Sequence, residues 1–365
     1  MRVRYDDQIF TLQRRGGISR YFVELIREFA AAPELGVEPE LGWRWTRNAH
    51  ALEAGLGRPL RFPGGSRGRV LRWANRTIEV RRLEPAVTHY TYYLPGYLSR
   101  RPTAPMAVTV HDMTPELFPD LFPGGNPHQL KREYVRRADL VLCNSESTRR
   151  DLLRVYGSVE APTMVVHHGI SRRFTPGAPK PSWCPDTYIL FVGGRGGYKD
   201  FRVAVESFAE VAPGRPGTAL IAVGGGALSA DEEALVSRWG LADRVIQRDA
   251  SDDELPAIYG GASAFVFPSR HEGLGLPTLE SMACGTPTVL ANSSSHPEVG
   301  GDAALYFSPG DTGALAAQLL RLLQDAELHR DLSAKGLARV KLFSTSQTAR
   351  ETARGYRVAA GGSGV

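Results

Sequence analysis

Short apolar runs rich in β-branched residues alternate along this chain with longer runs in which apolar residues recur every three or four positions. A short apolar run is typical of a buried strand in a parallel sheet, and the longer periodicity is typical of an amphipathic helix. The alternation therefore predicts repeated βα units. Because it occurs once in residues 1–173 and again in residues 187–343, we expect two α/β domains of Rossmann-like architecture.

The elements predicted from this pattern fall into two series. The first series has strands near residues 3–5, 86–90, 107–110, 140–143 and 164–167, with helices near 18–31, 127–137 and 145–156. The second series has strands near residues 188–192, 219–223, 244–247, 264–267, 288–291 and 304–307, most of them followed by a helix. Residues 312–357 have a largely helical pattern.

The two series are separated by residues 174–186, FTPGAPKPSWCPD. Four prolines and one glycine in this stretch interrupt any regular element, and we place the interdomain linker there. At the other end of the second series, residues 359–365 end in GGSGV and are expected to form a flexible tail.

Composition excludes several classes of protein. The chain has 365 residues, of which 42% are hydrophobic and 23% charged, as in ordinary globular proteins. No apolar run approaches the roughly 18 residues that a membrane-spanning helix needs. Charges interrupt the opening MRVRYDDQIF where a signal peptide would be apolar, and the three cysteines lack metal or disulfide spacing. We therefore expect a cytoplasmic protein with reduced thiols.

Charge is distributed unevenly. The formal net charge is +5, but most of the excess of arginine lies in the first half of the chain. A cluster there consists of Arg67, Arg69, Arg72, Arg76, Arg81 and Arg82, with Trp73 among them. This cluster is a candidate surface for anionic lipid at the cytoplasmic membrane face or for a pyrophosphate-bearing acceptor. A solvated arginine-rich face explains it equally well, and no accompanying motif indicates a nucleic-acid partner.

The most informative stretch is PSRHEGLGLPTLESMAC, residues 268–284. A predicted strand precedes it, and a predicted helix with Pro277 at its first position follows a glycine-rich turn. The free amides near Leu274–Leu276 and the positive end of the helix dipole would then point at one spot, which suits a phosphate. Glu272 and Glu280 flank that spot and can accept from hydroxyl groups, so the pattern favours a nucleotide-sugar site.

The arrangement of Glu272 and Glu280 around EGLGLP resembles the E-x7-E signature of retaining GT-B glycosyltransferases of family 4. The resemblance implies a GT-B fold, in which two Rossmann-like domains face a cleft and a C-terminal helix, here residues 344–358, crosses back to the first domain. It also implies that Glu280 accepts from the ribose and Glu272 from the sugar. The turn residues Gly273, Leu274, Gly275 and Leu276 would supply amides to the donor.

A second motif is YILFVGGRGGYKD, residues 188–200. Glycines such as Gly194 let a backbone approach a phosphate closely, and the cations Arg195 and Lys199 can offset its charge. The alternative, a dinucleotide-binding fingerprint, lacks its third glycine and a suitably placed acidic residue. The resemblance implies that Arg195 and Lys199 hold the donor diphosphate.

Two further motifs lie in the first half. Gly16 and Gly17 precede a predicted helix, in a GGISRYF opening that is similar to family 4 sugar transferases of bacterial surface polysaccharides. His111 follows a predicted strand at the edge where α/β proteins bind ligands. The resemblance implies that His111 contacts the transferred sugar and that the paired glycines lie against the donor. His89 ends another strand and is either a sugar contact or part of the core.

These motifs together predict a retaining glycosyltransferase. The resemblance favours GDP-mannose as donor, with UDP-glucose, UDP-N-acetylglucosamine and dTDP-rhamnose as alternatives, and a saccharide, lipid-linked or small-molecule acceptor. Asp252-Asp253 lacks D-x-D spacing, and we expect no metal or other cofactor. Two other functions stay open: a nucleotide-sugar epimerase of GT-B architecture, and a non-catalytic protein that binds a nucleotide sugar.

Overall fold

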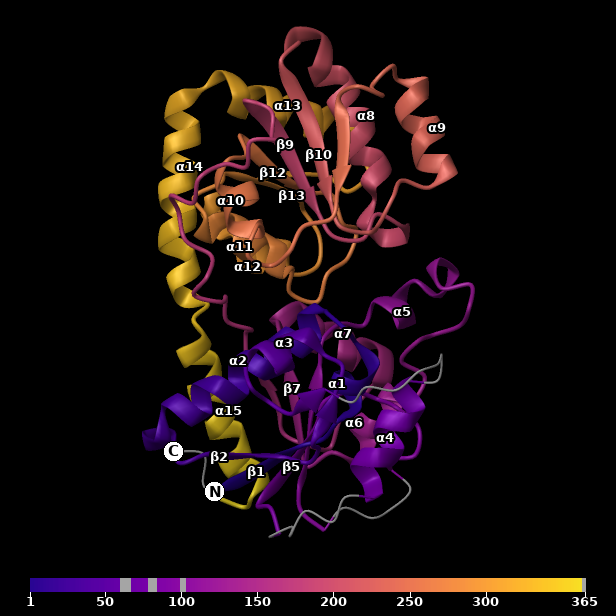
Figure 1. The fold of residues 1–365 in the computed structure, drawn as a ribbon, viewed down its shortest axis with the longest axis vertical. Helices are drawn as coiled ribbons and strands as arrows, with labels where there is room; N and C mark the ends of the chain where they lie inside the picture. The colour runs from indigo at the N-terminus through magenta and orange to yellow at the C-terminus, as the bar shows by residue number, and fades with distance from the viewer. Residues whose placement is uncertain (60–66, 78–83, 99–102, 363–365) are drawn as a thin grey trace. The chain divides into compact units, whose positions relative to one another are not determined.

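The computed structural model describes residues 1–59, 67–77, 84–98 and 103–362. The chain divides into two compact units: Met1–Gly169 together with Ser344–Val365, and Ile170–Phe343. Each unit is built on one six-stranded sheet, and Figure 1 labels strands of both. All strand pairs within these sheets are parallel, so the predicted fold class, with two Rossmann-like sheets, is confirmed.

The sheet of the first unit has the strand order β2-β1-β5-β6-β7-β8. Its strands are β1 (Arg2–Tyr5), β2 (Glu38–Leu41), β5 (Val87–Tyr90), β6 (Met106–Val110), β7 (Leu140–Cys143) and β8 (Thr163–Val165). The main helices are α2 (Gly17–Ala31), α4 (Arg67–Thr77), α6 (Lys131–Arg137), α7 (Glu146–Tyr156) and α15 (Thr345–Ala359). Shorter elements are α1 (Gln8–Leu12), α3 (Ala49–Glu53), α5 (Thr114–Leu117), β3 (Trp45–Thr46) and β4 (Arg58–Pro59).

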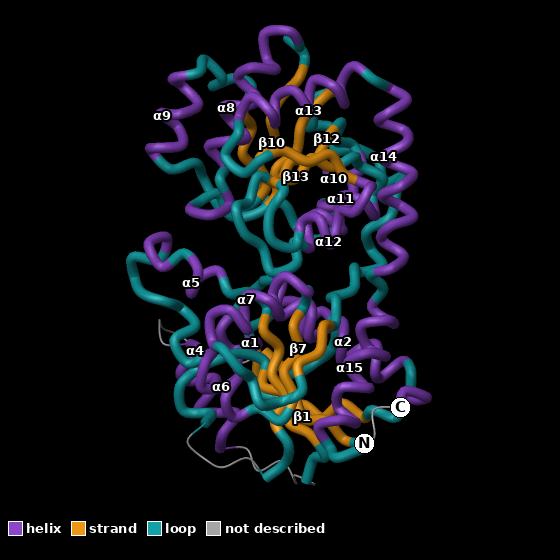
Figure 2. The backbone as a smooth tube through the Cα atoms, turned by 180° about the vertical axis from the view of Figure 1, so that it is seen from behind, coloured by secondary structure: helices purple, strands orange, loops and turns teal. Residues whose placement is uncertain are grey.

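Two hydrophobic layers cover this sheet. Helices α2 and α15 lie over one face and α6 and α7 over the other, as Figure 2 shows from behind, and their apolar side chains belong to two separate core clusters. The predicted return of the C-terminal helix is confirmed, because α15 packs on α2 and on β7. Close packing explains the glycine in this helix: a Cβ at Gly355 would lie 3.1 Å from Leu140 Cδ2.

The sheet of the second unit has the strand order β11-β10-β9-β12-β13-β14. Its strands are β9 (Thr187–Val192), β10 (Thr218–Val223), β11 (Val245–Arg248), β12 (Ala264–Phe267), β13 (Thr288–Ala291) and β14 (Ala304–Phe307). The helices are α8 (Phe201–Val211), α9 (Ala230–Arg238), α10 (Leu255–Gly260), α11 (Leu276–Ala283), α12 (His296–Gly300), α13 (Thr312–Gln324) and α14 (Ala326–Arg339). Helices α8, α9 and α13 cover one face, and α10 and α11 the other.

Two predicted boundaries differ from the structure by two residues or more. Helix α6 begins at Lys131 rather than at residue 127, because the Asn126 side chain accepts from the His128 amide at 2.6 Å and forms a turn there. Strand β8 ends at Val165 rather than at residue 167. Val165 pairs with Cys143, and Cys143 is the last residue of the neighbouring strand β7.

The arginine cluster of the first unit lies partly on α4. There Trp73 is 67% exposed, next in sequence to Arg72, while Arg81, Arg82 and the side chains of Arg67 and Arg76 lie outside the described residues. Contact of this cluster with lipid stays a prediction. Among the helices that the structure describes, none combines the length and the apolar character needed to cross a bilayer.

Candidate active site

Three loops of the second unit meet at the carboxyl edge of its sheet. The lysine loop, residues 193–200, follows β9; the glycine turn, residues 224–227, follows β10; and the glutamate turn, residues 268–276, follows β12. Since β10, β9 and β12 are neighbouring parallel strands, their carboxyl ends lie side by side. This is the edge where open α/β sheets bind ligands.

The glutamate turn leads directly into α11. Gly275 adopts a left-handed conformation with φ +84° and caps the helix, which begins at Leu276, one residue before the predicted start. A neighbouring loop braces the turn: Ser294 Oγ accepts from the Glu272 amide at 2.9 Å, and Ser295 Oγ donates to the Glu272 carbonyl at 3.1 Å. The turn therefore holds its backbone, and the start of α11, in a fixed position.

Lys199 and Glu272 meet across the first and third loops. The Lys199 ammonium donates to Glu272 Oε1 at 2.6 Å, and its side chain is 19% exposed. The same ammonium lies 5.1 Å from the ring centre of Phe267, at the end of β12. The structure thus brings together two residues that are 73 positions apart in sequence, and it leaves the cation near the surface.

A second pair of contacts fastens the lysine loop to the glutamate turn. The Arg270 amide donates to the Tyr198 carbonyl at 2.7 Å, and Arg270 Nε donates to Asp200 Oδ2 at 2.8 Å. Asp200 adopts a left-handed conformation with φ +51°, which few residues other than glycine, asparagine and aspartate tolerate. The two loops therefore behave as one structural element around Lys199.

Glu280 lies one turn into α11 and is almost fully buried. The Tyr259 hydroxyl, from α10, donates to Glu280 Oε2 at 2.9 Å and fixes the orientation of the carboxylate. Sequence reasoning missed Tyr259, because the tyrosine lies 21 residues before the glutamate and only the packing of α10 on α11 brings them together.

Arg195, which the resemblance implies holds the donor diphosphate together with Lys199, is buried. Its side chain is 4% exposed, and its guanidinium faces the glycine turn rather than the Lys199–Glu272 pair. It donates to the carbonyls of Gly224, Gly226 and Ala227 and to Glu232 of α9. Gly194, beside it, has no atom within 4 Å of the position where a Cβ would lie, so the chain is open there.

In the first unit, a histidine cluster of His89, His111 and His168 lies at the carboxyl edge of the sheet. His89 bonds the hydroxyls of Tyr356 and Thr109 at 2.6 and 2.9 Å. Among the described residues, neither ring nitrogen of His111 has a partner, and the same holds for Nε2 of His168. Tyr21 stacks on His168 with ring centres 3.8 Å apart. The cluster therefore offers hydrogen-bonding groups that the described protein does not satisfy.

Helix α2 begins next to these aromatic rings. Gly17 is its first residue and Gly16 its cap, and a Cβ at Gly16 would lie 2.3 Å from the Gln13 side chain. Tyr21, one turn further on, links the start of the helix to His111, with ring centres 5.8 Å apart. The structure thus brings the glycine pair and His111, two motifs predicted separately, into one region of the first unit.

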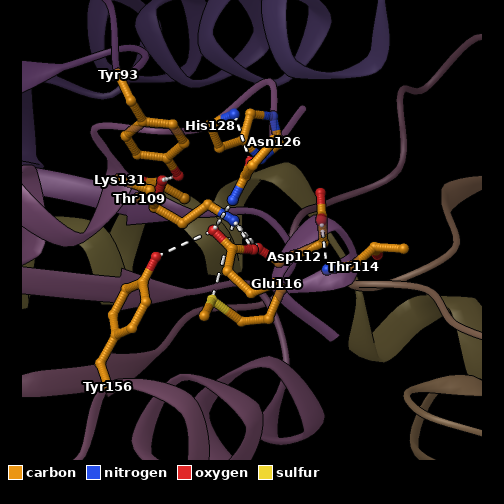
Figure 3. Close-up of polar contacts among 10 residues, drawn as sticks. Tyr93, Thr109, Asp112, Thr114, Glu116, Asn126, His128, Lys131 and Tyr156 are labelled. Carbon is orange, nitrogen blue, oxygen red and sulfur yellow. Dashed lines mark hydrogen bonds and ion pairs between the residues drawn. The ribbon is translucent and has the colours of Figure 1, made fainter. Parts of the chain in front are cut away.

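Directly after His111 in the chain, a buried polar network holds the loop that follows β6 (Figure 3). The fully buried Lys131 ammonium donates to the Asp112 carbonyl at 2.7 Å and to Glu116 Oε2 at 2.9 Å. The other Glu116 oxygen accepts from Asn126 and Tyr156. Burial acts to raise the pKa of Asp112, but the nearby Lys131 and His128 charges and the Thr114 amide outweigh it, so the pKa is lowered.

The histidine cluster predicts how stability depends on pH. Burial lowers the pKa of His89 and of His111 to about 3 and lowers that of His168 as well. The unfolded chain therefore binds protons first as the pH falls below about 6.5, and each histidine then removes up to about 1.4 kcal/mol of stability per pH unit. Asp6 acts in the opposite direction, because burial raises its pKa to about 7.

We therefore expect the urea midpoint of the first unit to fall between pH 7.5 and 5. His89→Gln is expected to flatten that slope by one proton, which the difference between the two midpoint curves measures. Identical slopes for the two proteins would contradict the assignment of His89 as a buried neutral imidazole.

Comparison with known proteins adds to this geometry. The family model "Glycosyl transferases group 1" matches residues 183–339, and the model "Glycosyltransferase Family 4" matches residues 15–174. The O-antigen chain mannosyltransferase B of Escherichia coli is 28% identical over 377 residues, covering 94% of this chain and 96% of the relative. The serotype-specific mannosyltransferase WbdA of Escherichia coli is 41% identical over 106 residues, 29% of this chain and 13% of WbdA.

A solved structure is similar in fold. Anabaena Alr3699/HepE in complex with UDP-glucose superposes with a TM-score of 0.74 at 18% identity, covering 96% of this chain and 98% of HepE. This likeness extends over both units. It shows that the architecture found here is that of a protein crystallised with a nucleotide sugar.

Proposed function

Because this chain belongs to the family 4 glycosyltransferases, also described as glycosyl transferases group 1, we propose that it moves mannose from GDP-mannose to a saccharide acceptor during polysaccharide or glycoconjugate assembly. Members of this family are retaining hexosyltransferases. The single observation that carries the proposal is the Lys199–Glu272 pair, held at the sheet edge beside the start of α11. Similarity to two mannosyltransferases supports the choice of sugar.

The chemistry follows from where negative charge develops. As the bond between the sugar and the diphosphate breaks, charge accumulates on the leaving diphosphate, and a fixed cation or amide near it lowers the barrier. Lys199 supplies the cation, and the first amides of α11 supply hydrogen bonds and the positive end of a dipole. These groups are already in place, because the braces on the glutamate turn and on the lysine loop hold them.

The two carboxylates accept hydrogen bonds from hydroxyl groups of the donor. Glu280 accepts from the ribose, and Glu272, which also holds the Lys199 ammonium, accepts from the sugar. In the first unit, His111 and the glycines at the start of α2 bind sugar hydroxyls and phosphate. His111 acts by hydrogen bonding rather than as a titrating acid, since its lowered pKa keeps the imidazole neutral near pH 7. The diphosphate itself takes the proton of the attacking hydroxyl on the same face of the sugar, so the reaction needs no protein base.

The test is an assay of the purified protein with GDP-mannose, UDP-glucose, UDP-N-acetylglucosamine and dTDP-rhamnose, each with and without a mannoside acceptor. We expect release of GDP and a lengthened saccharide with GDP-mannose only when acceptor is present. Conversion of the nucleotide sugar without acceptor would instead identify an epimerase. Binding of donor with neither hydrolysis nor transfer would identify a non-catalytic binding protein.

Replacing Glu280 with alanine is expected to weaken binding of GDP about 10- to 100-fold, because hydrogen bonds to a charged group contribute roughly 1.5–3 kcal/mol. Calorimetry with GDP and 2′-deoxy-GDP measures this loss. If Glu280 accepts from the 2′-hydroxyl, the wild type loses affinity for the deoxy nucleotide and the variant does not. Tyr259→Phe is the control for orientation, with a smaller loss expected, and equal GDP affinity of wild type and Glu280→Ala would overturn the ribose assignment.

A further inference from the structure

The Arg195 guanidinium is held inside the second unit by hydrogen bonds from all three of its nitrogens. Its Nε donates to Glu232 Oε1 at 3.0 Å, and its Nη2 donates to the carbonyls of Gly226 and Ala227 at 2.9 and 2.7 Å. Its Nη1 donates to the Gly224 carbonyl. To meet a phosphate, this buried side chain would have to exchange these bonds for new ones and leave three carbonyls without a donor.

The glycine turn has a shape that depends on such a donor. Gly224, Gly225 and Gly226 all have positive φ, at +88°, +78° and +72°, a run that only glycines adopt without strain. The turn directs several carbonyls toward one point, where their dipoles repel one another. A planar guanidinium with five N–H groups can satisfy several of them at once, which a lysine ammonium cannot do with the same geometry.

Glu232 extends the same network to α9. One of its oxygens accepts from Arg195, and the other accepts from the Ser229 amide at 2.8 Å as part of a capping box at the start of the helix. Arg195 therefore joins three segments: the lysine loop that contains it, the glycine turn and the first turn of α9. Lys199 lies four residues after Arg195 in the same loop. The end of the loop beside Lys199 is held by Arg270, which bonds Tyr198 and Asp200.

We propose that Arg195 is a positioning residue rather than a ligand of the diphosphate: it ties the lysine loop to the glycine turn and so sets the place of Lys199, the cation that meets the donor. The inference rests on the proposed function for the role of Lys199. The clamp itself, formed by Arg195, the glycine turn and Glu232, is a property of the fold and can be tested separately from transfer.

Two glycines of the turn provide a matched pair of variants. A Cβ at Gly225 would lie 2.8 Å from Arg195 Nη1, whereas a Cβ at Gly226 has no neighbour within 4 Å. Because both residues have positive φ of similar size, Gly225→Ala and Gly226→Ala introduce similar backbone strain, and only the first displaces Arg195. Neither variant changes a charge or a candidate ligand.

The clamp is measured first, by hydrogen exchange of the protein without donor. We expect Gly225→Ala and Arg195→Gln to speed exchange of the amides in residues 224–232, and Gly226→Ala and Lys199→Ala to leave it near the wild-type rate. Unchanged exchange in Arg195→Gln would overturn the clamp, whatever the outcome of the transferase assay.

Transfer kinetics then separate positioning from direct binding. A misplaced catalytic group can reduce the rate about 100-fold, so we expect Gly225→Ala to lower kcat by 10- to 100-fold and Gly226→Ala to lower it by less than threefold. Arg195→Lys is expected to be as impaired as Arg195→Gln, because lysine keeps the positive charge but lacks the planar set of N–H groups that bonds several carbonyls at once. If Arg195→Lys keeps most of the activity while Arg195→Gln loses it, the direct phosphate contact is correct instead.

Glu232→Gln is the last test variant. A negatively charged carboxylate is not expected to contact a diphosphate, so an effect of this substitution on transfer must be indirect. We expect this variant to lower kcat in the same direction as Arg195→Gln, and the double variant to be no worse than Arg195→Gln alone. Calorimetry with GDP checks the charge: the salt dependence of binding should stay as in the wild type for Arg195→Gln and decrease for Lys199→Ala. A decrease for Arg195→Gln, or unaltered kcat in Glu232→Gln, would overturn the proposal.

Discussion

Lys199→Ala is expected to lower kcat/KM for sugar transfer by about 10²- to 10³-fold, the loss typical of removing one fixed group that stabilises transition-state charge. The expectation follows from the position of the ammonium, which Glu272, Phe267 and the fastened ends of the lysine loop hold in a partly buried place. In such surroundings a cation acts more strongly than it would in water. Steady-state kinetics with a saturating acceptor measure the loss.

The control for this variant is Arg202→Ala. Arg202 lies three residues further on, but it is half exposed and pairs with Glu206 on the surface of α8. Arg202 also lies 4.0 Å from Asp200 Oδ1, but Asp200 keeps its bond to Arg270 when Arg202 is removed. The substitution deletes one positive charge from the same region and leaves the contacts of Lys199 in place, so we expect transfer within about twofold of wild type. Thermal unfolding of both variants separates a loss of chemistry from a loss of folding. Near-wild-type kcat/KM in Lys199→Ala would remove this residue from the mechanism.

Lys131→Met is expected to destabilise the first unit by about 3–5 kcal/mol, because removing one partner of a buried ion pair leaves the other charge uncompensated. The Glu116 side chain is 8% exposed and would keep only the neutral donors Asn126 and Tyr156 (Figure 3). The Asp112 carbonyl would also lose its donor. Urea unfolding, followed by a probe in the first unit, measures the change.

The double variant Lys131→Met with Glu116→Leu tests the reason for that loss. Replacing both charges of a buried pair by apolar residues is often close to neutral for stability, so we expect the second substitution to restore most of what the first removes. The same loop follows His111, and the double variant therefore also shows whether the pair matters for transfer once stability is restored. A double variant as unstable as Lys131→Met would show that the hydrogen bond to Asp112, and not the ion pair, is what counts.

Much of the fold could be predicted, because buried parallel strands are short apolar runs and several helices, such as α7 and α15, begin with a serine cap. Strand β2 (Glu38–Leu41) escaped detection since it is an edge strand with the sequence EPEL, and its alternating glutamates do not resemble a buried run. Proline is tolerated at such an edge. The start of α6 was missed because the turn at Asn126 depends on a side-chain contact that no local pattern reveals.

The candidate site was predicted unevenly, for a related reason. Glycine-rich loops after strands are visible in the sequence, and so are the residue types of Lys199, Glu272 and Glu280. Which way a side chain points within such a loop is not. Arg195 and Lys199 look equivalent in the sequence, but the carbonyls that hold Arg195 lie 29 to 32 residues later, in a GGGA stretch that only the neighbouring strand brings close. The GGGA stretch was a signal that could have been used.

The chain order of the two units has a consequence for biosynthesis. Ile170–Phe343 is continuous and can assemble as soon as it leaves the ribosome, whereas the N-terminal sheet lacks part of its core until α15 has been made. The Tyr356 hydroxyl, which meets Tyr5 and His89 at 2.9 and 2.6 Å, is synthesised only after the whole of Ile170–Phe343. The first unit therefore starts before the second and is completed after it, and a nascent chain that stops short of residue 356 leaves part of the first sheet uncovered.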